Sequence, residues 1–123
     1  MVDLLRKDVP LSHSNESEHR RLLAIAVNNP PIFDSVLTLA DDATPDVSLG
    51  NVWKTGGTTT ITDFDGGTLG QWLEILSEHA ITITDNSNII LSGGANFVMK
   101  ATDTLLLRMF NDGVWSEVSR SVN

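Results

Sequence analysis

Short apolar runs separated by turn-forming residues recur along most of the chain, and this pattern limits the possible folds most strongly. The densest part extends from Thr58 to Leu91, and further runs follow at Phe97–Met99, Leu105–Phe110 and Val114–Val118. Gly, Asn, Asp and Ser gather between the runs. Strands about 8–12 residues apart, each bounded by turn formers, are typical of a β-sandwich, a barrel or a stacked solenoid. The sequence therefore predicts a mainly β chain.

The chain has 123 residues, which corresponds to one domain with a short appendage. It contains no cysteine, so disulfides, thiolate zinc sites and a cysteine nucleophile are excluded. The first residues place charge where a signal peptide would be apolar. The longest apolar run, Leu22–Val27, is far shorter than the roughly 18 residues of a membrane span. We therefore expect no membrane insertion.

The net charge of −8 is unevenly distributed. Four basic and four acidic side chains balance in residues 1–31, so four bases and twelve acids lie in residues 32–123. An acidic surface of this kind repels phosphate backbones. We therefore expect no nucleic acid among the partners of residues 32–123.

Residues 15–28 carry the one clear helical pattern. Asn15 with Glu18 fits a capping box, and Pro30 and Pro31 end the segment. One helical face carries His19, Leu22, Leu23 and Ala26. A helix this short needs a partner, which is the β region, two further copies in a trimer, or a socket in a larger assembly. We predict an arm and helix in residues 1–31 and a β-structured domain in residues 32–123.

The strand predictions within residues 32–123 differ in strength. Ile32–Leu39 and Val47–Trp53 are read as the first two strands, while Leu69–His79 fits both a helical stripe and a strand face. The glycines before Leu69 and the strand repeat around it favour a strand. Ile81–Thr84 alternates apolar and polar residues, which predicts one dry and one wet face.

The run Thr104–Phe110 is apolar at positions of both faces. A strand that is dry on both sides needs a second layer, and in so small a chain we expect a neighbouring subunit to supply it. The residues 111–113 are predicted to form a three-residue hairpin loop with Gly113 in the left-handed conformation, leading into the strand Val114–Val118.

No pattern indicates catalysis, and we expect no enzyme activity, catalytic residue, metal or cofactor. The chain has no G-x-S-x-G elbow. Asp63, Asp65 and Glu74 fit three positions of a calcium loop, but Gly67 and Leu69 occupy other ligand positions. The histidines lack the spacing of a zinc site. A threefold axis bringing three copies of one histidine together and a pair of carboxylates meeting in a cleft stay open as alternatives.

The tryptophans Trp53, Trp72 and Trp115 are the best binding candidates, because an exposed indole stacks on a sugar ring. The alternative for each is packing in the core or at a subunit interface. They support a second hypothesis, a monomeric carbohydrate-binding β-sandwich.

The order of motifs from Thr44 to Arg120 resembles a known family. The motifs are TPDVS, GNVWK, ITDF, GTLGQ, ITITD and IILSGG, and they end in W-x-E-x-S-R at Trp115–Arg120. The order is similar to that of the carboxy-terminal β-domain of tailed-bacteriophage tail fibres and tailspikes, in which three chains form a β-prism or β-helix. The resemblance implies a homotrimer on the virion, with a role in attachment to the host surface, including surface glycans, or as an adaptor bound to capsid, neck, tail or baseplate proteins.

A trimer is also expected on physical grounds, because open strand edges are an aggregation hazard unless another chain covers them. Each buried aliphatic side chain contributes roughly 1.5–3 kcal/mol. The predicted trimer core comprises Ile81, Ile83, Ile89, Leu91, Leu105 and Leu107, and the predicted virion-docking residues are Leu22, Leu23 and Ala26.

Overall fold

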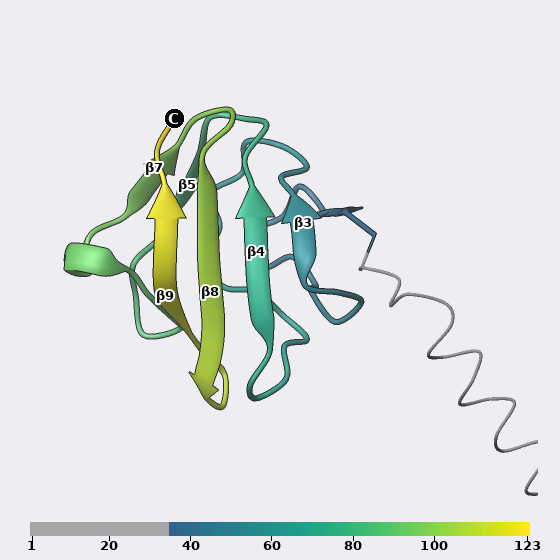
Figure 1. Cartoon of the computed structure of the whole chain (residues 1–123), viewed down its shortest axis with the longest axis vertical. Coiled ribbons are helices and arrows are strands. Elements are labelled where there is room, and N and C mark those ends of the chain that lie inside the picture. Colours follow the sequence, from purple (N-terminus) through teal and green to yellow (C-terminus); the bar gives the residue numbers. More distant parts are fainter. Residues whose placement is uncertain (1–34) are drawn as a thin grey trace, which may run out of the picture. The chain divides into compact units, whose positions relative to one another are not determined.

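A computed structural model describes residues 35–123, which belong to a compact unit that begins at Asp34. The predicted helix at 15–28 and its residues Leu22, Leu23 and Ala26 lie outside the described residues. The described chain is mainly β, as predicted, with one short 3-10 turn, η1 (Ser92–Gly94) (Figure 1). No helix in this part of the chain has the length and apolarity needed to cross a membrane.

Six strands form a mixed sheet in the order β2-β3-β4-β8-β9-β6. The strands β2, β3 and β4 are parallel to one another, β8 is antiparallel to both β4 and β9, and β6 is parallel to β9. Their bounds are β2 (Leu37–Thr38), β3 (Val52–Lys54), β4 (Trp72–Leu76), β6 (Ile89–Ile90), β8 (Thr104–Asn111) and β9 (Val114–Ser121).

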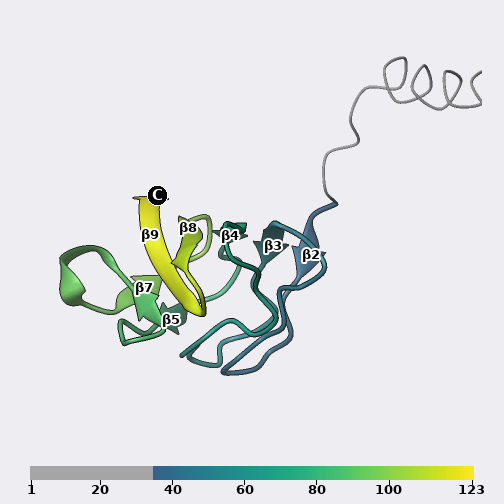
Figure 2. The same ribbon diagram turned by 90° about the horizontal axis from the view of Figure 1, so that it is seen from below.

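A smaller antiparallel pair, β5 (Ile81–Ile83) and β7 (Phe97–Met99), forms the second sheet. Figure 2 shows this pair and the long loops before β3 and β4 on the same side of the six-stranded sheet. The six-stranded sheet therefore has an inner face, which these elements cover, and an outer face.

The chain from β2 to β5 winds in successive turns. The loops that join its parallel strands also form isolated parallel bridges. Asp46 of the loop before β3 pairs with Asp65 of the loop before β4, and Ile61 of the latter loop pairs with Ile83 of β5. The amide of Val47 donates to the carbonyl of Asp65 at 2.8 Å. Each turn therefore bonds to the next along more than one side.

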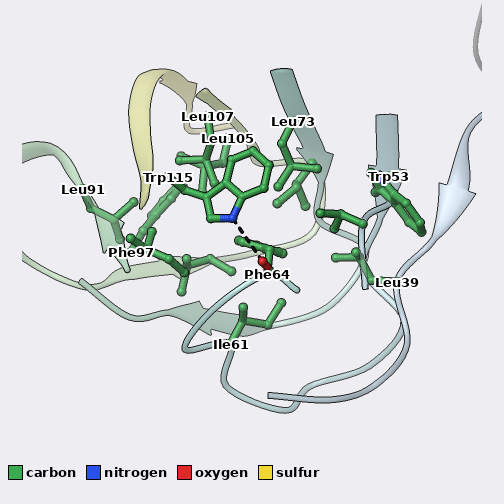
Figure 3. Close-up of a cluster of buried hydrophobic side chains, with 14 of the residues drawn as sticks. Leu39, Trp53, Ile61, Phe64, Leu73, Leu91, Phe97, Leu105, Leu107 and Trp115 are labelled. Carbon is green, nitrogen blue, oxygen red and sulfur yellow. Dashed lines mark hydrogen bonds between the residues drawn. The ribbon is translucent and has the colours of Figure 1, made fainter. Parts of the chain in front are cut away.

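The core lies between the inner face and the elements that cover it (Figure 3). Trp115 is completely buried at its centre, and the ring of Phe64 meets the indole edge-on, with centroids 6.2 Å apart and planes at 81°. Such an edge-to-face pair adds about 0.5–1.5 kcal/mol beyond the area that it buries.

The ambiguous segment Leu69–His79 contains strand β4, so the strand interpretation is confirmed. The second predicted strand, Val47–Trp53, is shorter than expected, because only Val52 and Trp53 of it belong to β3. The carboxylate of Asp46 accepts a hydrogen bond from the amide of Ser48 at 2.8 Å, and such a local bond favours a turn over a continuous strand.

The chain itself covers one face of strand β8, so only the other face is left for the neighbouring subunit expected to supply a second layer. Leu105, Leu107 and Met109 are buried by the chain's own elements, because they alternate onto the inner face. Arg108 and Phe110 alternate onto the outer face, where Phe110 is 58% exposed.

The hairpin between β8 and β9 is also tighter than predicted. Asn111 pairs with Val114, which leaves only Asp112 and Gly113 at the tip. Gly113 has φ 76°, so the prediction of a left-handed glycine is confirmed.

Candidate functional site

The strongest candidate site is a cluster of Trp72, Arg108 and Phe110 on the outer face of the six-stranded sheet, here called the aromatic–arginine cluster. Arg108 of β8 pairs directly with Trp72 of β4. Its Cζ lies 4.5 Å from the centroid of the Trp72 ring and 5.5 Å from that of Phe110. Trp72 is 39% exposed and Phe110 58% exposed. A cation and two aromatic surfaces are thus presented together at the surface.

Alternation along β4 and β8 places these side chains outward. Leu73 and Ile75 of β4 are buried, as are Leu107 and Met109 of β8, so their neighbours in sequence project to the other face. The pairing between β4 and β8 extends to the residues just before β4. The backbone carbonyl of Met109 accepts a hydrogen bond from the amide of Gly70 at 2.7 Å, and the Met109 amide donates one to the carbonyl of Gln71 at 3.0 Å. The cluster therefore stands on paired, well-supported backbone.

The charge of Arg108 is not neutralised by any residue in the range 35–123. Lys54 forms an ion pair with Glu78 at 3.4 Å, and Arg120 forms one with Glu117 at 2.7 Å. Arg108 has aromatic rings beside it instead of a carboxylate, and its Nε is buried without a hydrogen-bond partner. Each cation–π contact at an exposed site contributes only about 0.5–1 kcal/mol. The guanidinium therefore keeps N–H donors that no described side chain uses.

A shallow hollow lies directly before Trp72 in the chain, between the loops 48–51 and 68–71. The side chain of Gln71 holds the loops together: its Nε2 donates to the carbonyl oxygens of Val47 at 2.9 Å and Gly50 at 3.2 Å, and its Oε1 accepts from the amide of Thr68 at 2.9 Å. The lining is largely polar, and two exposed leucines flank it: Leu49 and Leu69.

Of the three tryptophans predicted to contact a glycan, only Trp72 presents its ring to solvent. Trp53 is 4% exposed, with its Nε1 donating to the carbonyl of Gly50 at 2.9 Å, and Trp115 is completely buried. Their indoles fill the core and leave no face for a sugar. For Trp53 and Trp115 the alternative of core packing is correct.

The six residues predicted to form a trimer core are all buried within one chain. Four of them have no exposed surface at all: Ile83, Ile89, Leu105 and Leu107. Ile81 and Leu91 are almost as deeply buried. In this conformation they offer no surface to another chain, so a trimer must use other side chains. The trimer itself stays a prediction.

The carboxylates suggested for a calcium loop do not come together as a site. Burial raises the pKa of Asp63, whose Oδ1 accepts a hydrogen bond from the amide of Phe64 at 2.8 Å. Across residues 35–123, no three His, Asp or Glu side chains are placed to hold a metal ion. His79 is bonded through Nδ1 to the hydroxyl of the buried Thr55 at 2.7 Å, which is a structural contact.

Glu117 is the other carboxylate with a specific partner. The Arg120 guanidinium holds the pKa of Glu117 below its usual value, helped by the amide of Ser92, which donates to Oε1 at 2.8 Å. Arg120 in turn lies over the ring of Phe97, with its Cζ 3.9 Å from the centroid. The hydrogen bond from Ser92 fastens the segment after β6 to β9, and the ion pair within β9 holds Glu117 in place for it, so these contacts serve the fold.

Arg108 was missed as a site residue by the sequence analysis. A signal existed, because it interrupts the apolar run of β8 at a position that alternates with Leu105, Leu107 and Met109. Its partner Trp72 lies on another strand, and the β4–β8 register that joins them is a tertiary feature.

No protein-family model, no curated protein and no solved structure matches this chain.

Proposed function

We propose that this chain is a structural virion protein of a tailed bacteriophage, a short trimeric fibre or spike component that attaches to the host surface or acts as an adaptor on the particle. In this proposal residues 1–31 dock to other virion proteins, and residues 32–123 form the trimeric head, as a β-prism, a β-helix or a sandwich-like unit. The winding of β2, β3 and β4 supports the choice of a helix-like unit.

One observation carries the proposal: the six-stranded sheet exposes large apolar side chains on strands β4, β6, β8 and β9. Trp72 is 39%, Ile90 47%, Phe110 58% and Val118 44% exposed. Soluble monomers rarely leave contiguous apolar patches uncovered, and such patches mark interaction surfaces. Among the described residues, Ile90 of β6 and Val118 of β9, beside the edge of the sheet, are therefore the proposed contact between copies, and the buried inner face of β8 is not.

The free edges of the sheet support the same proposal. The strand β6 pairs with only Trp115 and Ser116 of β9, so β9 continues from Glu117 to Ser121 without a described strand on that side. An open edge invites pairing with another chain. Association of three copies along this edge protects it together with Ile90 and Val118, and leaves the aromatic–arginine cluster on β4 and β8 open to a ligand.

Light scattering of the full chain at micromolar concentration tests the trimer. We expect a mass of three chains, and a monomer would refute the trimeric fibre. Replacing Ile90 and Val118 by serine should shift the mass toward that of one chain. Val98→Ser is the matched control, because Val98 is 66% exposed but lies on β7 of the small sheet. Immunogold labelling of the parent particle tests the location.

The exposed indole of Trp72 favours carbohydrate binding as a second candidate function, either in a monomer or as the attachment activity of the fibre. A glycan array with the wild-type chain and Trp72→Ala tests it. We expect the substitution to abolish binding, because a ring that stacks on a sugar would be lost. Trp72→Phe is the control that retains an aromatic face, and unchanged binding by Trp72→Ala would refute this function.

A further inference from the structure

We propose that the aromatic–arginine cluster binds an acidic sugar of an oligosaccharide and that Arg108 selects the carboxylate of that sugar. The inference rests on the carbohydrate-binding function proposed for Trp72. It adds the charge of the ligand, the residue that recognises the charge, and the direction in which the oligosaccharide extends.

The charge distribution is the first step. Residues 35–123 contain eleven acidic and only four basic side chains, so most of their surface repels an anion. Lys54 and Arg120 are each paired with a glutamate, and Lys100 has the carboxylate of Asp103 beside it, which accepts a hydrogen bond from the Lys100 amide at 2.9 Å. Arg108 is the basic residue whose close neighbours are aromatic rings. Because charges at the surface act over about 8–10 Å at moderate salt, an anion is attracted at this cluster more than elsewhere on the described surface.

The geometry of the guanidinium is the second step. Trp72 and Phe110 pack against it, and its Nε is the one buried side-chain nitrogen or oxygen in residues 35–123 that has no hydrogen-bond partner. The two Nη atoms make no hydrogen bond to any described residue, so they remain available to a ligand. A carboxylate matches such a pair of N–H donors in a two-point hydrogen bond, and a guanidinium is the side chain best shaped for it.

The surroundings favour a sugar over a protein partner. The exposed part of the Trp72 indole offers a flat apolar surface for a sugar ring beside the carboxylate. The hollow between loops 48–51 and 68–71 is lined up to Gln71, the residue before Trp72, and its Ser48, Asn51 and Thr68 suit the hydroxyl groups of further sugars. A stable protein partner needs about 800 Å² of contact on each side, far more than three side chains and a shallow polar hollow provide.

Calorimetric titration of the full chain tests the proposal. The probes are tri-galacturonate and α2,8-linked trisialic acid, each compared with its neutral, carboxyl-reduced counterpart. We expect the wild-type chain to bind at least one acidic trimer roughly tenfold or more tightly than its neutral counterpart, since a charge-assisted two-point hydrogen bond is lost on reduction. The preference should weaken as salt is raised.

Three variants locate the effect. Arg108→Gln should reduce binding of the acidic trimer to the level of the neutral one. Arg108→Lys keeps the charge but loses the planar pair of donors, so an intermediate affinity is expected. Lys54→Gln is the matched control. It removes one positive charge from β3, the strand beside β4, and should leave the preference for the acidic trimer unchanged. Far-UV circular dichroism and the urea midpoint of each variant show whether it folds. If Arg108→Gln does not fold, the comparison of Arg108→Lys with the wild-type chain provides the test.

Each other outcome overturns the inference in a recognisable way. Equal binding of acidic and neutral trimers, lost in Trp72→Ala, refutes the role of Arg108 while carbohydrate binding stands. Failure of the wild-type chain to bind any of the four trimers refutes the inference, and the glycan array separately decides whether carbohydrate binding by Trp72 stands. A lower mass of Arg108→Gln in light scattering, without a change in sugar preference, assigns Arg108 to a contact between copies of the chain.

Discussion

Trp115 donates a hydrogen bond from its indole Nε1 to the carbonyl oxygen of Phe64, 3.2 Å away and 51 positions earlier in the chain. The bond joins the last strand to the loop that precedes β4, and both residues are buried. Figure 3 shows it at the centre of the apolar cluster. The polar atom of the largest core side chain is therefore satisfied without water.

Replacing Trp115 by phenylalanine should lower the free energy of unfolding by about 2–4 kcal/mol, because it leaves a cavity and a buried carbonyl without a donor. The measurement is urea denaturation followed by circular dichroism. Trp72→Phe, on the exposed outer face, is the control and should cost less than about 1 kcal/mol. Equal losses from both variants would contradict the central role of Trp115.

Gly67→Ala should destabilise the fold by about 1–3 kcal/mol, because the added methyl group would meet the Trp115 ring and the Met109 methyl group. Gly56→Ala should cost more, since its methyl group would collide with the backbone carbonyl of Leu39, which cannot rotate away. Thermal unfolding gives the order. Ser87→Ala in an exposed turn is the control, and a smaller loss for Gly56→Ala than for Gly67→Ala would contradict the packing.

Acid should weaken the fold through Asp103. Backbone N–H groups of Asn123 (2.8 Å) and Lys100 (2.9 Å) donate to its carboxylate and hold its pKa below the ordinary 3.8. A lowered pKa stabilises the folded state above 3.8, and that contribution disappears as the pH falls through the folded value. The stability gap between wild type and Asp103→Asn should therefore be full at pH 6 and shrink below about pH 4.

Asp63 provides a control of opposite sign for this pH dependence. Because burial raises its pKa, ionised Asp63 disfavours the folded state, and this penalty appears as the pH rises above 3.8. Asp63→Asn should gain stability relative to wild type over that range in the same urea titrations. A gap for Asp103→Asn that does not change with pH would refute its role in acid sensitivity.

Thr102→Gly should stabilise the protein or leave it unchanged, although glycine usually weakens a fold. Thr102 has φ 77°, a left-handed conformation that costs a β-branched residue about 1–3 kcal/mol. Glycine removes this strain but adds about 0.5–1 kcal/mol of entropy cost, so a gain of up to about 2 kcal/mol is expected. The hydrogen bonds of Thr102 to Ser77 and Asn123 use its backbone and persist. Ala101→Gly, measured by the same urea midpoint, should be destabilising, and a comparable loss in Thr102→Gly would refute the strain.

Local patterns allowed the sequence to predict most of the strands. Ile81 and Ile83 of β5 are buried as their alternation indicates. The turn at 85–88 forms as its composition predicts, because Asn86 accepts hydrogen bonds through Oδ1 from the amides of Asn88 (2.7 Å) and Ile89 (3.0 Å). Such features depend on residues close in the chain, and short-range sterics and hydrogen bonding decide them.

The sequence by itself thus determined that the described chain is β-rich, where several of its turns lie, and that alternate residues of its strands are buried. Only the tertiary structure decided what buries them and what stays outside: one chain covers Leu105 and Leu107, whereas Arg108 meets Trp72 on an exposed face. The physical reason is that alternation of apolar residues shows which face of a strand is buried, but it does not show which other elements pack against that face. The cover and the outer cluster depend on strand register between residues far apart, which no local pattern encodes.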